Sequence, residues 1–294
     1  MSKPKKVPIV QGTRVVAPVP AMPANPTGST AWLANVPGLF IRQRMEVMEA
    51  LTGCETRNRY DIIRLLERPS AQLSSDYLYA AGLRAEASAN PLLKAKERSD
   101  CCERVCCPLF RGFTMDFIDA RGTPFFSLER PFVCEPCPCW PCYSCHSQRL
   151  SMNDKDGALL ATAHEPAYGC GCTCERSFFV EDPSGAQVYR LAADDCSARS
   201  GGCSNFCAPS CCNETFDVDV FTPGGEYINT STFVWPGCNC GGLTERSNLI
   251  AAFPEGASTD ERAALIAGLM LVEYTVMEKK RQQDGGGGGG GGGG

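Results

Sequence analysis

Histidine is scarce in this sequence, and long apolar runs are absent. His146 and His164 are the only histidines in 294 residues, and no Ser-His-Asp or Cys-His-Asn arrangement is discernible around them. A thiol protease or an acyltransferase is therefore disfavoured, and both histidines are interpreted as ordinary surface or loop residues. Because no run of 18 or more apolar residues occurs, an ordinary membrane-spanning helix is unsupported.

An excess of positive charge is also missing. The chain has 28 Lys and Arg against 33 Asp and Glu, a net charge of −5, so we expect no nucleic-acid partner. Lys3, Lys5 and Lys6 are followed by no apolar segment, so we expect no signal peptide and an intracellular location. A mitochondrial targeting sequence is the alternative interpretation of this basic N-terminal segment, which is rich in Lys rather than Arg and is interrupted by proline.

Low-complexity segments lie at both ends of the chain. Residues 1–36 are rich in proline and are predicted to be a disordered, extended tail. Residues 282–294 are predicted to be a second disordered tail, because Gly285–Gly294 is an uninterrupted glycine run. The whole sequence is 43% hydrophobic, enough to bury a core, and residues 37–281 are predicted to form one domain.

Four segments between the tails have the pattern of β-hairpins, with apolar residues alternating along strands and glycine in the turns. The predicted turns are residues 119–122, 153–157, 182–185 and 222–225, each between two strand-like runs. A meandering antiparallel sheet is the fold that this pattern favours. Residues 60–63 and 77–79 are predicted to add two further strands.

Two segments have a helical pattern. Ile41, Met45, Met48 and Leu51 share one helical face, which predicts a helix over residues 40–52 that ends before Gly53. A second helix is predicted over residues 262–279, and its segment 263–277 is apolar on every face except at Glu273. At about 22 Å this segment is shorter than the roughly 30 Å hydrocarbon layer. We expect a helix buried inside a sheet that curls around it; a membrane-inserted or reversibly exposed helix is the alternative.

The 20 cysteines are grouped between the predicted hairpins, so several are expected to share one rim of the sheet. Without secretion they are expected to be thiols, metal ligands or lipid-attachment sites rather than disulfides. Zinc is one interpretation, with Cys101, Cys102, Cys106 and Cys107 as candidate thiolates. S-palmitoylation is another, because the run of residues 134–145 combines cysteines with prolines and with the interfacial aromatics Trp140 and Tyr143. Unmodified thiols are the third.

Several pieces of the sequence together resemble the phospholipid scramblase family over residues 36–281. The matching pieces are residues 36–39, 50–62, 100–102 with 106–107, and 127–131 before the Cys/Pro-rich run, followed by the apolar C-terminal helix with its single acid. The resemblance implies a tubby-like fold, a closed antiparallel β-barrel of about 12 strands around a buried C-terminal helix. It also implies palmitoylation of Cys134, Cys137, Cys139, Cys142 and Cys145.

The sequence departs from the family pattern in three places. The basic nuclear-import stretch of some members is absent, because residues 230–235 hold no Lys or Arg, so nuclear import through that segment is not expected. In the family, a calcium-binding loop precedes a Phe-Pro pair, here Phe253-Pro254, and this chain offers it only Glu245, Ser247 and the Asn248 amide, with Gly256 at the closing position. A calcium site needs several oxygen ligands and a closing carboxylate, so we predict weak calcium binding and no control by cytosolic calcium. Residues 64–99 are expanded, and Arg64–Glu67 and Leu92–Glu97 favour helix there, which predicts an insertion able to bind a protein partner.

Three functions are therefore expected. The first is a membrane-associated phospholipid scramblase-like or lipid-binding protein at the cytoplasmic face of the plasma membrane or an organelle, anchored by acyl chains and the N-terminal lysines. It would move phospholipids in both directions without ATP and without covalent chemistry. The second is a non-catalytic barrel scaffold in a larger assembly, with partners at the Pro-rich N-terminus and the 64–99 insertion. The third is a structural zinc-thiolate protein.

Overall fold

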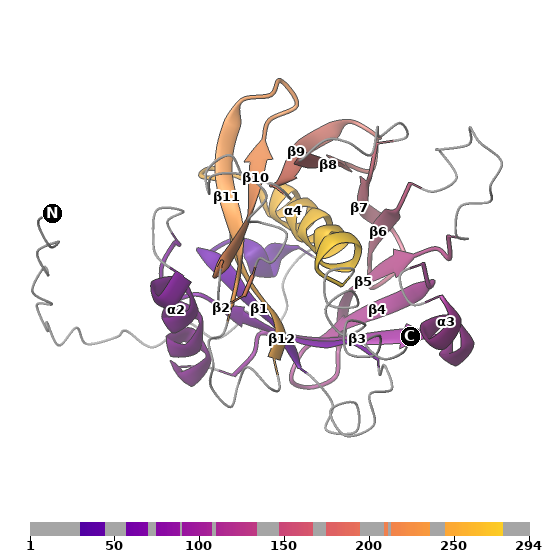
Figure 1. The fold of residues 1–294 in the computed structure, drawn as a ribbon, viewed down its shortest axis with the longest axis horizontal. Coiled ribbons are helices and arrows are strands. Elements are labelled where there is room, and N and C mark those ends of the chain that lie inside the picture. The colour runs from indigo at the N-terminus through magenta and orange to yellow at the C-terminus, as the bar shows by residue number, and fades with distance from the viewer. Residues whose placement is uncertain are drawn as a thin grey trace, which may run out of the picture.

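The protein forms a closed twelve-stranded antiparallel barrel around a helix, as Figure 1 shows. The computed structural model describes residues 30–44, 57–69, 75–88, 90–107, 110–133, 147–166, 175–194, 209–210, 213–235 and 245–278. Each strand pairs with its neighbours in the sequence, and β1 closes the barrel by pairing with β12. The predicted fold class, a closed antiparallel barrel with a central C-terminal helix, is confirmed.

The strands are β1 (Gly38–Arg44), β2 (Arg59–Arg64), β3 (Leu93–Ser99), β4 (Phe113–Ile118), β5 (Pro124–Arg130), β6 (Arg149–Asp154), β7 (Leu159–His164), β8 (Glu175–Glu181), β9 (Gln187–Asp194), β10 (Thr215–Phe221), β11 (Tyr227–Val234) and β12 (Glu245–Ala252). The helices are η1 (Ala31–Leu33), α2 (Ser75–Ser88), α3 (Cys101–Cys106), α4 (Thr259–Val272) and the π-helical continuation of α4, η6 (Glu273–Met277).

The four predicted hairpins are confirmed, and their turns share one chemistry. Gly122, Gly157, Gly185 and Gly225 have positive φ angles between 81° and 85°, which glycine adopts without the steric cost that a side chain would add. In the first three turns an aspartate carboxylate accepts backbone N–H bonds from the residues two and four positions later. These local signals are why the hairpins can be predicted from the sequence.

Helix α4 lies inside the barrel, as its apolar sequence predicts (Figure 1). Every residue from Ala263 to Val272 is buried, and a capping box between Ser258 and Glu261 fixes the start of the helix. Gly268 lets the helix approach the barrel wall, because a Cβ there would lie 2.6 Å from Leu191 Cδ1 and 2.7 Å from Val180 Cγ2. The helix is therefore part of the core.

The predicted helix over residues 40–52 is wrong at its start, because residues 40–44 belong to β1. Apolar residues occupy both faces of this strand: one face points into the barrel and the other is covered by α2. Phe40 packs there with Ile63, Leu78 and Ile250. A strand buried on both faces lacks the alternation that identifies a strand in sequence. The remainder of the predicted helix lies outside the described residues.

Two further predictions in the same region are wrong. Residues 77–79, predicted as a strand, lie in α2, and Leu92–Glu97, which favours helix, lies almost entirely in β3. Pairing of β3 with β2 and β4 outweighs its helix propensity. Its alternation of buried Leu93, Ala95 and Glu97 with exposed Lys94 and Lys96 is the pattern of a strand.

Residues 30–36, which composition places in the N-terminal tail, pack over the end of the barrel where α4 begins. Trp32 and Leu33 are buried, and the Trp32 ring stacks on Phe126 with centroids 6.0 Å apart. Thr30 Oγ1 donates to Asp260 Oδ1 at 2.6 Å, and Arg262 Nη1 donates to the Leu33 carbonyl at 2.8 Å. This turn covers the start of α4. Residues 1–29 and 279–294 lie outside the described residues.

Candidate functional site

The two ends of the barrel differ in what their connections carry. One end, which we call the hairpin end, holds the four tight turns and the start of α4. The opposite end, which we call the cysteine end, is where the chain passes from β1 to β2, β3 to β4, β5 to β6, β7 to β8, β9 to β10 and β11 to β12. All 20 cysteines lie in these six connections, residues 45–58, 100–112, 131–148, 165–174, 195–214 and 235–244. The strand ends that flank every cysteine-bearing segment therefore meet at one rim.

The candidate zinc thiolates lie on and beside the short helix α3 at the cysteine end. Cys101, Cys102 and Cys106 are exposed, Cys107 is half-buried, and none of the four is in a disulfide. The Asp100 carboxylate begins the helix by accepting from Cys102 N at 2.7 Å. Within the described ranges, no three His, Cys, Asp or Glu side chains gather closely enough to hold a metal ion.

The candidate palmitoylation residues Cys134, Cys137, Cys139, Cys142 and Cys145 lie outside the described residues. The chain that leads into them is described. Phe132 keeps 46% of its surface exposed, whereas Val133 is buried and bonds through its N–H to the Phe110 carbonyl at 3.0 Å. An exposed aromatic side chain thus stands where the Cys/Pro-rich segment leaves the barrel.

The candidate calcium residues Glu245, Ser247 and Asn248 belong to β12 rather than to a loop. This strand pairs with β1 on one side and with β11 on the other. Asn248 lies opposite Arg42 of β1, and its side chain is 1% exposed. The side chains of Glu245 and Ser247 are outside the described part of the structure. Gly256 follows in a turn with φ of 75°.

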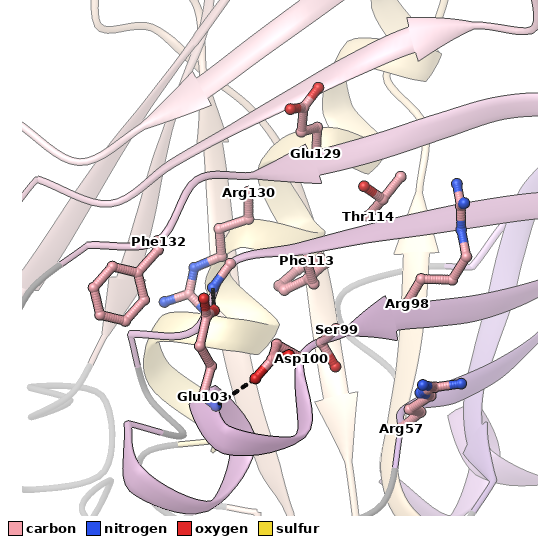
Figure 2. A pocket seen from close by; sticks show the side chains of 11 residues that line it. Arg57, Arg98, Ser99, Asp100, Glu103, Phe113, Thr114, Glu129, Arg130 and Phe132 are labelled. Carbon is pink, nitrogen blue, oxygen red and sulfur yellow. Dashed lines mark hydrogen bonds between the residues drawn. The ribbon is translucent and has the colours of Figure 1, made fainter.

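An open pocket of about 640 Å³ lies at the cysteine end between α3 and the ends of β3, β4 and β5 (Figure 2). Three arginines and three carboxylates line it, with Phe113, Phe132 and smaller residues between them: Arg57, Arg98, Arg130, Asp100, Glu103 and Glu129. Two of the carboxylates accept hydrogen bonds from backbone N–H groups of the protein. Asp100 caps α3, and Glu103 accepts from Gly112 N at 2.7 Å. The lining therefore carries both signs of charge in equal number.

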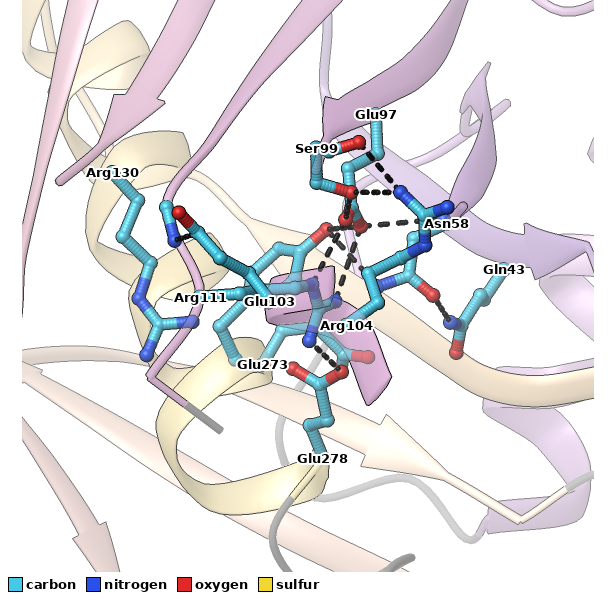
Figure 3. Close-up of polar contacts among 12 residues, drawn as sticks. Gln43, Asn58, Glu97, Ser99, Glu103, Arg104, Arg111, Arg130, Glu273 and Glu278 are labelled. Carbon is cyan, nitrogen blue, oxygen red and sulfur yellow. Dashed lines mark hydrogen bonds and ion pairs between the residues drawn. The ribbon is translucent and has the colours of Figure 1, made fainter. Parts of the chain in front are cut away.

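Behind this pocket lies a buried cluster of charged side chains at the end of the central helix (Figure 3). Arg111 binds Glu97 through two hydrogen bonds, Nε to Oε1 at 2.9 Å and Nη2 to Oε2 at 3.2 Å. Its Nη1 donates to Glu278 Oε1 at 2.7 Å. Arg130 is the second buried cation and donates from Nε and Nη2 to Gln148 Oε1 at 3.1 and 2.6 Å. The cluster thus places two arginine side chains among buried carboxyl groups, of which Glu273 is a third.

Aromatic and polar groups complete this cluster. The guanidinium of Arg111 lies 5.6 Å from the centroid of the Tyr274 ring, and that of Arg130 lies 5.8 Å from the centroid of Phe113. Tyr274 donates its hydroxyl to Glu97 Oε2 at 3.2 Å. Because Tyr274 lies in η6 and Glu278 follows it, the cluster ties the end of the helix to β3 and to the segment before β4.

The pKa values of the cluster follow from burial opposed by pairing. Burial raises the pKa of the Glu97 carboxyl, but the hydrogen bonds and charge of Arg111 outweigh it, so the pKa of Glu97 lies below its usual value. Burial also lowers the pKa of Arg111, and the charges of Glu278 and Glu97 overcome this and raise it. Burial lowers the pKa of Arg130, and Glu278 opposes that shift only in part. Glu97 and Arg111 are therefore both ionised at neutral pH.

A comparison with protein families identifies the barrel. The model of the family described as Scramblase matches residues 84–279, more than half of the chain. The chain belongs to the scramblase family.

Curated scramblases are similar to this family member over most of its length. Phospholipid scramblase 2 of Bos taurus is 25% identical over 262 residues, which are 89% of this chain and 75% of the relative. Phospholipid scramblase 1 is 24% identical in Mus musculus and in Homo sapiens, over 89% of this chain and 67% and 69% of those relatives. No solved structure matches. In the described part of this scramblase-family chain, no helix combines the length and apolarity needed to cross a membrane.

Sequence reasoning missed the buried charged cluster of this scramblase-family barrel, although a signal for part of it exists. Glu97 and Arg130 each continue the inward-facing series of their strands, after Leu93 and Ala95 in β3 and after Phe126 and Leu128 in β5. A charge at an inward-facing position predicts a buried partner. No comparable pattern marks Arg111, which lies between α3 and β4.

Proposed function

We propose that this scramblase-family barrel moves phospholipids between bilayer leaflets in both directions without ATP, while attached to the cytoplasmic face of a membrane by its cysteine end. One observation carries the proposal beyond family membership: all 20 cysteines lie in the six connections at one end of the barrel. Attachment through that end would present one defined surface of the barrel to the bilayer.

Membrane attachment is proposed to use two signals. The first is thioester-linked acyl chains on Cys134, Cys137, Cys139, Cys142 and Cys145. The second is the attraction of Lys3, Lys5 and Lys6 to anionic lipids. One acyl chain alone gives only marginal, reversible binding, whereas two signals give stable anchoring.

Scrambling is proposed to be independent of calcium in the cytosolic range. The strand placement of Glu245–Ala252 supports this, since its pairing with β1 and β11 engages the main chain of that segment. Asn248 is buried, and the closing position is Gly256, which has no carboxylate.

Reconstitution of the purified full-length chain tests the proposal. Liposomes labelled in both leaflets with a fluorescent phospholipid lose about half of their emission when dithionite bleaches the outer leaflet. We expect a second, complete loss when the chain is present, without nucleotide and equally in chelator and in micromolar calcium. Liposomes without protein are the control. A half-bleached endpoint with the folded chain present would refute lipid movement, and a rate that depends on calcium would refute calcium independence.

A non-catalytic scaffold is the second candidate, because α2 adds a surface to the outside of the barrel. Leu83 and Tyr77 of this helix are exposed, and its inner side is fixed to β1 by ion pairs from Glu86 to Arg42 and Arg44. Such a surface suits a protein partner. Membrane-bound chain that leaves the liposomes half-bleached would favour this role. The zinc-thiolate role would be supported by stoichiometric zinc in the purified chain.

A further inference from the structure

We infer that the pocket at the cysteine end binds the headgroup of a zwitterionic phospholipid, a phosphodiester joined to a cationic amine. This inference rests on the proposed function, which requires lipid headgroups to meet the barrel. The lipid headgroup would first contact the protein in this pocket, between α3 and the ends of β3, β4 and β5. Its lining includes Arg57, Arg98, Glu129, Arg130 and Phe132 (Figure 2).

The phosphate side of the pocket is formed by Arg57 and Arg98, which lie on the same side of it in Figure 2. Arg57 is exposed, and its guanidinium donates no hydrogen bond to another described residue. Arg98 pairs with Asp116 at 2.6 Å and keeps 64% of its side chain exposed, so it has donors left for a ligand. Guanidinium groups bind phosphate oxygens through paired N–H donors.

The amine side is formed by Glu129, which lies away from Arg57 in Figure 2. Glu129 is exposed on β5 opposite Thr114, and within the described part of the chain its carboxylate takes part in no hydrogen bond or ion pair. A cationic amine can pair with this carboxylate. Asp100 and Glu103 contribute less, because backbone N–H groups already occupy their oxygens.

The buried arginine at the back of the pocket makes the site rigid. Arg130 is held by Gln148 and by the rings of Phe113 and Tyr274, so its positive charge cannot swing away. An equal number of positive and negative groups disfavours a purely anionic ligand and favours one that carries both charges. A volume of about 640 Å³ accommodates a headgroup and leaves the acyl chains outside, beside α3 and the start of the Cys/Pro-rich segment.

Titration calorimetry on the full-length chain tests this site. The ligands are dihexanoylphosphatidylcholine below its micellar concentration, glycerophosphocholine, glycerol 3-phosphate and choline. We expect saturable binding of the two zwitterions, and at least tenfold weaker binding of the anion and of the cation. Arg57→Ala and Glu129→Gln should each weaken zwitterion binding at least tenfold. Arg121→Ala and Glu226→Gln, which change exposed residues in the turns of the hairpin end, are matched controls and should bind normally.

The outcomes separate this inference from the proposed function. Equal binding by the pocket variants and the controls, or tighter binding of glycerol 3-phosphate than of glycerophosphocholine, would overturn the zwitterion site even if the chain scrambles lipids. Much tighter binding of glycerophosphocholine than of the short-chain lipid would assign the pocket to a soluble phosphodiester and overturn the lipid assignment. Selective zwitterion binding by a chain that leaves liposomes half-bleached in the dithionite assay would support the site while refuting lipid movement. Unchanged melting temperatures of both pocket variants are expected, since these exposed side chains hold no other part of the protein.

Discussion

At the scale of single residues, the charges buried at the end of the central helix are the least expected feature of the core. Glu97 and Arg111 are fully buried as an ion pair with two hydrogen bonds. Such a pair adds little stability over apolar residues of the same size, but removal of one partner leaves an uncompensated charge. Glu278 is 167 residues from Arg111 in the sequence. The pairing of Arg111 with Glu278 therefore could not be predicted from local spacing, whereas the burial of Glu273 could be predicted from the apolar helix around it.

Replacement of Arg111 by Met should be strongly destabilising. The substitution leaves Glu97 and Glu278 buried without their cation, and we expect a loss of about 3–5 kcal/mol in the free energy of unfolding. Urea titration followed by circular dichroism measures this. Arg98→Met is the matched control, because Arg98 forms an exposed pair with Asp116 that is worth at most about 1 kcal/mol. Equal losses of unfolding free energy in the two variants would show that the buried cluster contributes no more to stability than an exposed ion pair.

At the scale of secondary-structure elements, the prediction is correct where local residues specify the element and wrong where the element depends on packing against another segment. The four hairpins are specified locally, by alternating apolar residues, by Gly in all four turns and by Asp in three of them, and all four are predicted correctly. Strand β1 and helix α2 are not, because each depends on the other: α2 buries the outer face of β1 through Leu78 and Phe40. Gly82 of α2 lies directly against the Phe40 ring, where a Cβ would be 2.8 Å from it.

The central helix is the element on which the barrel depends most. Leu269 is fully buried in the middle of α4, so Leu269→Asp places an unpaired carboxylate in the core at a cost of several kcal/mol, comparable with the stability of a whole domain. We expect the variant to be insoluble or to lack a cooperative thermal transition. Ala257→Asp, at a half-exposed position before the helix, should melt normally. A folded Leu269→Asp variant with unchanged melting would contradict the packing of α4 inside the barrel.

At the scale of the whole molecule, the protein has two unlike ends. The sequence predicted this asymmetry, as a rim shared by several cysteine groups, although the strands before Cys101 were predicted wrongly. Three strands, β1 to β3, precede Cys101, whereas the sequence predicted only two there, residues 60–63 and 77–79. This error leaves the asymmetry intact, because successive cysteine-rich groups are separated by one hairpin. Connections that are two strands apart lie at the same end of an antiparallel meander. The headgroup pocket could not be predicted in this way, because its walls come from three strands and α3.

Membrane attachment through the cysteine end can be tested by changing the Cys/Pro-rich segment as a whole. We expect replacement of Cys134, Cys137, Cys139, Cys142 and Cys145 by Ala to release the protein from membranes without a change in melting temperature. Each acyl chain contributes about 0.8 kcal/mol per buried methylene, and Lys3, Lys5 and Lys6 alone supply only about 1 kcal/mol each. Membrane fractionation, with loss of hydroxylamine-sensitive acyl groups, measures the effect.

A second cysteine set at the same end provides the comparison. Cys101, Cys102, Cys106 and Cys107 lie in or beside a helix that is held by its own cap and by Glu103, so their replacement by Ala should leave both folding and membrane attachment intact. If either set instead holds zinc, its replacement should lower the melting temperature and remove bound metal, because a structural zinc site contributes directly to folding free energy. Retained attachment together with retained stability in the first variant would count against both acylation and zinc there, and would leave the lysines and the rim of the barrel itself as the membrane-binding surface.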